Sequence, residues 1–244
     1  MRTSNPAISQ KLFEKSKTMD LPGKMTIKGA INKSFLMLGL ILVSGSLTWQ
    51  AAAGGATWVQ GALGGAAITG FILALATIFS PKTAHITAPL YALAQGVVMG
   101  AVSQMYNNFY DGIVQQAILL TIAVFLLMLL LYRTGTLKAT PKFRRGVFIA
   151  TGAVAVVYLF HWIAGMFGGS GIPMINDSGL TGIVFSLVIV GIAAFNLIID
   201  FDNISRGEEY GAPKRYEWYS AFALMVTLIW LYLEILRLLA KLRR

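Results

Sequence analysis

The chain is 244 residues long, and 56% of its residues are hydrophobic while only 12% are charged. Soluble domains carry about 25% charged residues, so this composition excludes an ordinary globular protein and leaves no length for a separate soluble catalytic domain. The absence of cysteine excludes disulfides, thiolate metal sites and cysteine nucleophiles. The net charge of +10 comes from Lys and Arg beside apolar stretches, which is typical of membrane proteins, so we expect no nucleic-acid partner.

Seven apolar stretches are long enough to cross a membrane, because the hydrocarbon core of a bilayer requires about 20 apolar residues per helix. In chain order, the predicted helices cover residues 35–53, 58–79, 84–106, 112–132, 147–167, 179–199 and 220–240. The predicted fold class is an all-α integral membrane protein, a bundle of seven transmembrane helices in the lipid bilayer. Its predicted parts are a cytoplasmic N-terminal segment, residues 1–33, and the seven-helix domain, residues 34–244.

Lys and Arg are unevenly divided among the connections between these helices. The first, third and fifth connections contain neither and hold only Asp111 and Asp177 as charged residues, whereas the other connections and the N-terminal segment are basic. Since basic residues stay on the cytoplasmic side, the N-terminus of this multi-pass protein is predicted to be cytoplasmic. An alternative, a signal peptide cleaved near residues 51–53, is disfavoured because the polar region before it is too long.

The C-terminus conflicts with this rule. Seven crossings from a cytoplasmic N-terminus place it outside, yet the chain ends Lys241-Leu242-Arg243-Arg244. Either the last helix crosses and its terminal charges snorkel into the outer headgroups, or the helix enters and returns to the cytoplasmic side. Residues 220–240 are long enough to span the bilayer, which favours crossing.

Small residues four positions apart occur in the second and third predicted helices, as Gly61/Gly65 and Gly96/Gly100. Small side chains let helix backbones approach closely in lipid. We therefore expect the second and third helices to pack through these glycines.

Ionisable side chains near or inside the spans are the first candidates for function, because a buried charge in lipid is costly unless it is protonated, paired or wet. Glu234 lies deep in the last span, and the simple alternative for it is an ion pair with Arg237, three residues later. Asp200 and Asp202 end the sixth span. They are about 200° apart around a helix, so we expect only one to face the bundle, the alternative being two solvated carboxylates.

Several enzymatic and metal-binding chemistries are disfavoured. The stretch from Asp200 to Gly207 begins like a calcium loop but does not supply its later ligands. His85 and His161 lack the helical spacing of a zinc site, so a membrane hydrolase with His161 and the acids as metal ligands is improbable. Ser186 and Ser220 have no identifiable base partner. We expect no enzyme and no cofactor.

Four stretches resemble the Bax inhibitor-1 family, the transmembrane BAX-inhibitor-motif proteins, from about the second span to the last. They are Ile199-Asp200-Phe201-Asp202-Asn203-Ile204, Leu231-Tyr232-Leu233-Glu234-Ile235, Val97-Val98-Met99-Gly100 and, similar to a bacterial branch, Arg2-Thr3-Ser4-Asn5-Pro6. The resemblance implies a seven-helix bundle with the last helix central, a pH-sensitive calcium leak, and location in the bacterial inner membrane.

The resemblance also implies roles for individual residues. Asp200 and Glu234 correspond to a carboxylate pair that senses protons and binds calcium transiently, and Lys82 to a basic latch on Asp200; Asp202 and Arg237 are secondary candidates. Glu234 stands where the family has Asp, and Lys82 where it has Arg, which loses bidentate geometry. Two close carboxylates cannot both ionise cheaply, so the pair would titrate as a unit, and proton loss would attract a calcium ion.

The predicted function is therefore a pH-sensitive membrane calcium (cation) leak channel or exchanger, gated by Asp200 and Glu234, with calcium and protons as its ions. The alternative is a non-transporting membrane regulator that binds other membrane proteins, such as a membrane protease, with Glu234 as a structural contact.

Glu234 lies about 21 Å along a helix that starts at Ser220. For the two acids to meet, the last helix must extend beyond the lipid, and we expect its first turns to be solvated.

Overall fold

The computed structural model describes residues 23–169 and 171–244, and within these ranges it contains helices but no strands. Seven helices are long and apolar enough to cross a membrane, which confirms the predicted fold class. They are α2 (Ile27–Ala53), α3 (Trp58–Phe79), α4 (Ala84–Phe109), α5 (Ile113–Arg133), α6 (Pro141–Met166), α8 (Leu180–Glu209) and α9 (Tyr216–Leu242). Two short helices, η2 (Pro81–Thr83) and α7 (Pro173–Asn176), lie in the connections.

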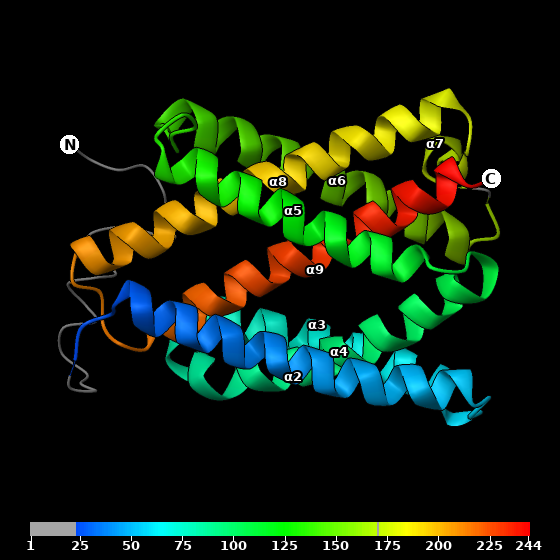
Figure 1. Cartoon of the computed structure of the whole chain (residues 1–244), viewed down its shortest axis with the longest axis horizontal. Helices are drawn as coiled ribbons and strands as arrows, with labels where there is room; N and C mark the ends of the chain where they lie inside the picture. Colours follow the sequence, from blue (N-terminus) through cyan, green and yellow to red (C-terminus); the bar gives the residue numbers. More distant parts are fainter. Residues whose placement is uncertain (1–22, 170) are drawn as a thin grey trace.

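The last helix, α9, runs through the middle of the bundle, drawn from orange to red in Figure 1. It packs against α2, α4, α5 and α8, and 50% of the residues in its most apolar stretch are buried, compared with 11% in α3 and in α6. Its buried residues include Ala221, Met225, Leu231 and Leu236, which belong to the main hydrophobic core. The last helix is central because it buries side chains against helices on several sides.

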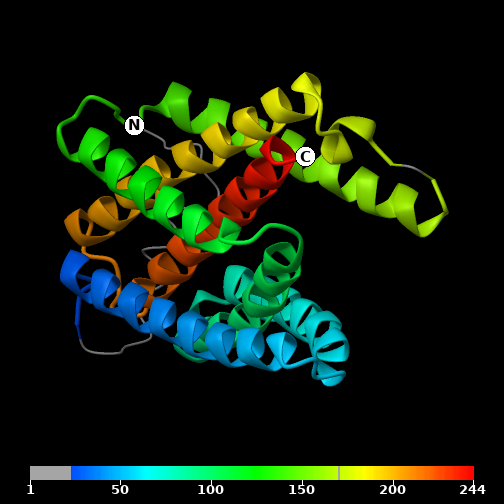
Figure 2. The same cartoon turned by 45° about the vertical axis from the view of Figure 1, so that its right-hand side comes forward.

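Successive long helices are antiparallel, so their connections alternate between two ends of the bundle (Figures 1 and 2). We call the basic end the one that carries the start of α2, η2, the α5–α6 connection and the α8–α9 connection. The opposite end carries the α2–α3, α4–α5 and α6–α8 connections and the C-terminus. The basic connections of the sequence thus gather at one end, and the assignment of that end to the cytoplasm stays a prediction.

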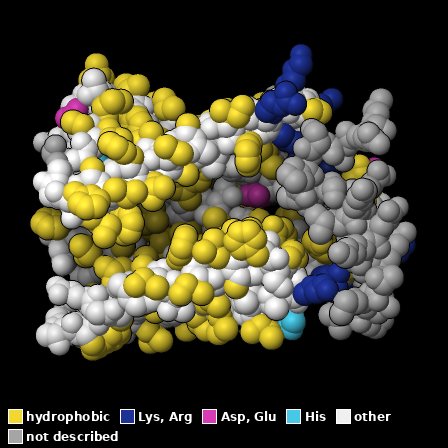
Figure 3. Space-filling model, turned by 180° about the vertical axis from the view of Figure 1, so that it is seen from behind, with side chains coloured by type: hydrophobic (Ala, Val, Ile, Leu, Met, Phe, Trp, Pro, Cys, Tyr) yellow, Lys and Arg dark blue, Asp and Glu magenta, His cyan; other side chains and the backbone are white. Residues whose placement is uncertain are grey.

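The outer surface of the bundle is apolar along its length. Phe79, Phe148 and Leu180 each expose more than three quarters of their surface. Figure 3 shows hydrophobic side chains spread over one face, with Lys and Arg towards one end. Large exposed apolar surfaces of this kind are what lipid contact requires, so the helices are placed for a bilayer.

Helices at the basic end extend beyond their predicted apolar cores. The first begins at Ile27, inside the predicted N-terminal segment, because the Thr26 side chain accepts a hydrogen bond from an amide of the first turn. The fifth begins at Pro141, capped in the same way by Thr140, and the sixth continues to Glu209. Hydropathy measures only the part of a helix that lies in lipid, whereas capping residues determine where it begins.

The close approach between glycines joins α2 and α4, not α3 and α4. A Cβ atom added to Gly96 or Gly100 would collide with backbone atoms of α2, at Gly45 among others. A Cβ atom at Gly61 or Gly65 would have no neighbour within 4 Å. The expectation that the second and third helices pack through both glycine pairs is therefore wrong, because the α3 pair lies in open space.

The C-terminal helix is continuous to Leu242 and ends at the opposite end of the bundle from the start of α2 (Figure 1). The alternative in which it returns to its own side is wrong. Lys241, Arg243 and Arg244 also have protein partners instead of extending freely outward. These partners are the carbonyl oxygens of Met174, Gly182 and Asp111 and the side chains of Gln116 and Tyr110.

Candidate functional site

Asp200, the predicted acid of the sixth span, links α8 to the central helix. Its carboxylate is half-buried, and its Oδ2 atom accepts a hydrogen bond of 2.6 Å from the hydroxyl of Thr227 on α9. The same hydroxyl lies 3.2 Å from the carbonyl oxygen of Ala223, so it has a second acceptor within its own helix. A change in the charge of Asp200 therefore acts directly on a contact between α8 and α9.

Glu234, the predicted acid of the last span, is only 2% exposed and is surrounded by donors. Arg237 lies 2.9 and 3.0 Å from its two oxygens, which confirms the simple alternative of a pair within one helix. Two neutral donors complete the set, the Tyr158 hydroxyl of α6 at 3.0 Å and the Trp230 indole nitrogen at 3.2 Å. Arg237 neutralises the carboxylate and also lies over the Tyr158 ring, 5.0 Å from its centroid.

The two acids meet the central helix at different heights, Asp200 from α8 and Glu234 as part of α9 itself. Thr227, which holds Asp200, precedes Glu234 by seven residues, a rise of about 10.5 Å along an α-helix. Each carboxylate has its own partners, and within residues 23–169 and 171–244 no hydrogen bond joins one acid to the other or to the other's partners. The structure thus brings both acids to α9 at contacts with different helices, α8 for Asp200 and α6 for Glu234.

Asp202 lies on the other side of α8 from Asp200 and is the centre of a charged network. It forms ion pairs with Arg144 of α6 and, at 2.6 Å, with Arg206 of its own helix, and the Tyr132 hydroxyl of α5 lies 3.4 Å away. Its side chain is only 15% exposed. The alternative of two solvated carboxylates is therefore wrong, as is the expectation that only one acid faces the bundle. Since α8 lies between α9 and the α5–α6 pair, both of its faces meet protein.

Lys82, the predicted latch, lies at the basic end in η2 with an exposed side chain. Asp200 receives its hydrogen bond from Thr227 instead. The contact between Lys82 and Asp200 therefore stays a prediction for another state of the protein.

A buried carboxylate that the predicted site did not include, Glu217, connects the first turn of α9 to the start of α2. One of its oxygens accepts hydrogen bonds from the amide and hydroxyl of Thr26, at 3.0 and 3.2 Å, and the other pairs with Lys33. A Cβ atom at Gly29 would overlap this carboxylate, so the absence of a side chain makes room for it. Glu217 is 2% exposed, so the expectation that the first turns of α9 are solvated is wrong for this side chain, whereas Tyr216 and residues 218–220 are partly exposed.

Metal-binding capacity at the acids is limited in this conformation. Among the described residues, no group of three or more His, Cys, Asp or Glu side chains is arranged to hold a metal ion. Asp200 offers a carboxylate beside one hydroxyl, whereas Glu234 is already paired with a guanidinium. Oxygen donors of the type calcium prefers are thus concentrated at Asp200 rather than Glu234.

The seven apolar helices and the ionisable groups held between them define a multi-pass helical membrane protein. A family model described as "Bax inhibitor 1 like" matches residues 5–244, nearly the whole chain. The chain therefore belongs to the Bax inhibitor 1 like family, which confirms the resemblance found in the sequence; the bacterial branch stays a prediction. Neither a curated protein nor a solved structure matches the chain.

Proposed function

We propose that this protein is a proton-sensitive cation leak pathway with calcium as its cargo, in which Asp200 and Glu234 couple proton binding to the packing of the central helix. The observation that carries this proposal is that each acid holds one lateral contact of α9. Asp200 links it to α8 through Thr227, and Glu234 links it to α6 through Tyr158. Ionisable groups at such positions inside a membrane usually serve ion or proton movement.

The two acids would contribute differently. Asp200 is half-buried, and among the described residues it forms no hydrogen bond or ion pair with a cation. The charge of Arg144, which is paired with Asp202, acts on Asp200 only through space, so the charged form of Asp200 still attracts a cation. The protonated form of Asp200 does not attract a cation. Its new O–H group is a hydrogen-bond donor, so it can donate to the Thr227 hydroxyl instead of accepting from it. Glu234 is buried whereas the Arg237 side chain is 32% exposed, so protonation of Glu234 would leave a partly buried guanidinium without its counter-charge and weaken the contact to α6. We assign ion attraction to Asp200 and gating to Glu234.

One face of the bundle is hollowed. Figure 3 shows a hollow between the two halves of the molecule with an acidic side chain on its floor. A charge at the bottom of a hollow is less hydrated than one on an open surface, so its field acts more strongly on an approaching cation.

The test is calcium flux into liposomes that contain the purified full-length protein, measured with an enclosed dye between pH 5 and 8. We expect Asp200→Asn to remove the pH dependence of the leak. Glu209→Gln, an exposed acid beyond the spans, is the matched control and should leave the pH profile unchanged. Absence of calcium flux in the unmodified protein at every pH would overturn the proposal.

Glu234 needs a second comparison, because Glu234→Gln leaves the partly buried Arg237 guanidinium without its counter-charge whether or not Glu234 gates the leak. The double variant Glu234→Gln/Arg237→Met removes both charges together. If Glu234 gates the leak, this variant should fold and conduct with an altered pH profile. An unchanged profile in the folded double variant would restrict Glu234 to a structural contact.

The alternative function, a regulator that binds other membrane proteins, is favoured by a different observation. Helices α3 and α6 bury only 11% of their most apolar stretches within the bundle. Their apolar faces are available to lipid or to a helix of another protein. A folded protein that carries no calcium at any pH would favour this function over the leak.

A further inference from the structure

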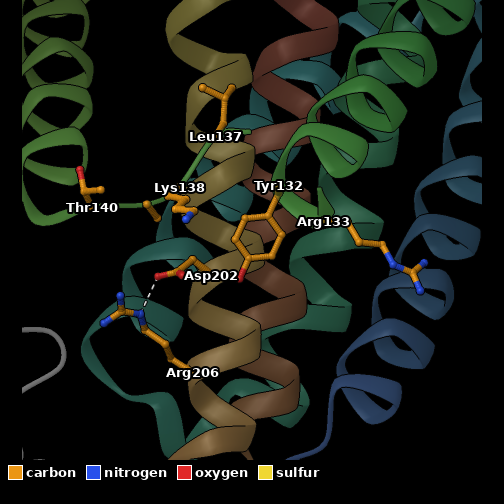
Figure 4. Close-up of a pocket in the computed structure, with 8 residues that line it drawn as sticks. Tyr132, Arg133, Leu137, Lys138, Thr140, Asp202 and Arg206 are labelled. Atoms are coloured by element: carbon orange, nitrogen blue, oxygen red, sulfur yellow. Dashed lines mark hydrogen bonds and ion pairs between the residues drawn. The ribbon is translucent and has the colours of Figure 1, made fainter. Parts of the chain in front are cut away.

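A pocket of about 560 Å³ lies at the basic end, between the α5–α6 connection and α8 (Figure 4). Arg133, Lys138 and Arg206 contribute three basic side chains to its lining, and Asp202 contributes the one acid. Figure 4 shows Lys138 and Arg206 near Asp202, while Arg133 extends on the far side of Tyr132. The pocket therefore has more positive than negative groups.

The acid in this pocket is already neutralised by protein. Asp202 is paired with both Arg144 and Arg206, so two guanidiniums share one carboxylate. Within residues 23–169 and 171–244, neither Arg133 nor Lys138 forms an ion pair or a side-chain hydrogen bond. No described protein group therefore neutralises Arg133 or Lys138. The neighbouring group of one carboxylate and two guanidiniums also carries an excess positive charge, so the pocket is a site for an anion.

The position of the pocket indicates the source of the anion. α5 ends at Arg133 and α6 begins at Pro141, so the pocket lies where the apolar helices meet water. Leu137 is part of its lining, and Leu130 of α5 and Phe148 of α6 present exposed apolar surface nearby along the chain. A ligand that combines a phosphate with acyl chains satisfies both the cations and these apolar faces, whereas a soluble phosphate compound satisfies only the cations.

We infer that this pocket binds the headgroup phosphate of an anionic membrane lipid at Lys138, while Arg133, on the other side of Tyr132, adds to the positive field of the pocket (Figure 4). Basic pockets between membrane helices bind anionic lipid headgroups in general. The inference does not depend on calcium transport, because neither Arg133 nor Lys138 forms a hydrogen bond or ion pair with Asp200 or Glu234 in the described structure.

The test is lipid binding by the purified full-length protein in neutral detergent, followed by native mass spectrometry. Phosphatidylglycerol and phosphatidylcholine with the same acyl chains are the probes, and we expect at least tenfold tighter binding of the anionic lipid. The variant Arg133→Gln/Lys138→Gln should lose this affinity by about 30-fold, since each basic residue contributes roughly fivefold. The matched control Lys142→Gln/Arg145→Gln removes the same charge from exposed positions outside the pocket and should lose less than about threefold.

Three results would overturn the inference. Equal losses in the two double variants would indicate general attraction to the basic end, and equal binding of the two lipids would indicate no headgroup site. Displacement of the lipid by an equal concentration of glycerol phosphate would assign the pocket to a soluble phosphate compound. If the pocket variant unfolds in a thermal melt, Lys138→Gln alone replaces it, with an expected loss of about fivefold.

Discussion

The contact between α2 and α4 gives the most direct test of the packing, through Gly96→Ala. A Cβ atom built on Gly96 would lie 2.6 Å from the carbonyl oxygen of Ile41 and 3.0 Å from its Cα atom, and closer still to the Ser44 hydroxyl. The hydroxyl can rotate away, but the backbone of α2 cannot. To restore an ordinary contact of 3.4 Å to the carbonyl oxygen, the two helices must separate by the difference, about 0.8 Å.

The expected cost follows from two opposing terms. Inserting a methyl group into a packed contact costs about 1–3 kcal/mol. Replacing Gly by Ala inside a helix contributes about 1 kcal/mol in the other direction. Gly65→Ala in α3 is the matched control, because it has the same helix-propensity term while a Cβ atom there meets nothing within 4 Å. The difference between the two variants therefore isolates the packing cost, and Gly96→Ala should be the less stable by about 1–3 kcal/mol.

Unfolding in mixed micelles of a mild and a denaturing detergent, followed by the loss of helical circular dichroism, measures this difference. Both variants should remain monodisperse in the mild detergent alone, so that the same folded state is compared. Equal free energies of unfolding for Gly96→Ala and Gly65→Ala would contradict the close approach of α2 and α4.

Two further predictions concern buried charges, and the same unfolding assay measures both. Glu217→Gln removes the buried charge that pairs with Lys33 and should lower the free energy of unfolding by about 1–3 kcal/mol, whereas Glu209→Gln, an exposed acid, should change it by less than about 0.5 kcal/mol. Lys241→Met keeps the length of the side chain but leaves two backbone carbonyls without their donor, so a loss of about 1–3 kcal/mol is expected. Stability equal to the unmodified protein in either variant would show that the buried charge is not needed.

The sequence predicted the number and order of the long helices because the hydrophobic length of a span is a local property. Hydropathy predicted the ends of these helices less well. The first turns of α2 and α6 are polar and depend on capping by Thr26 and Thr140 rather than on hydropathy. Those signals are present in the sequence, so helix starts were predictable in principle.

Partners across helices could not be predicted in this way. The pair of Glu234 and Arg237 follows from a spacing of three residues within one helix, and it was an explicit alternative. Tyr158, by contrast, reaches Glu234 from 76 positions earlier in the chain, and only the packing of α6 brings it there. The glycines of α4 likewise mark a face that allows close approach without specifying which helix approaches.

The basic C-terminus is compatible with the positive-inside rule, although α9 runs from the basic end of the bundle to the opposite end (Figure 1). The rule describes hydrated Lys and Arg that stay beside the membrane. Lys241 is only 6% exposed and donates to two backbone carbonyls, while Arg243 and Arg244 donate to groups of the α4–α5 region at the opposite end. These cations donate to protein groups, so they do not act as free charges that oppose the crossing. The division of Lys and Arg among the connections therefore keeps its value as a predictor of orientation, and the C-terminal cations instead anchor α9 to the connections around its end.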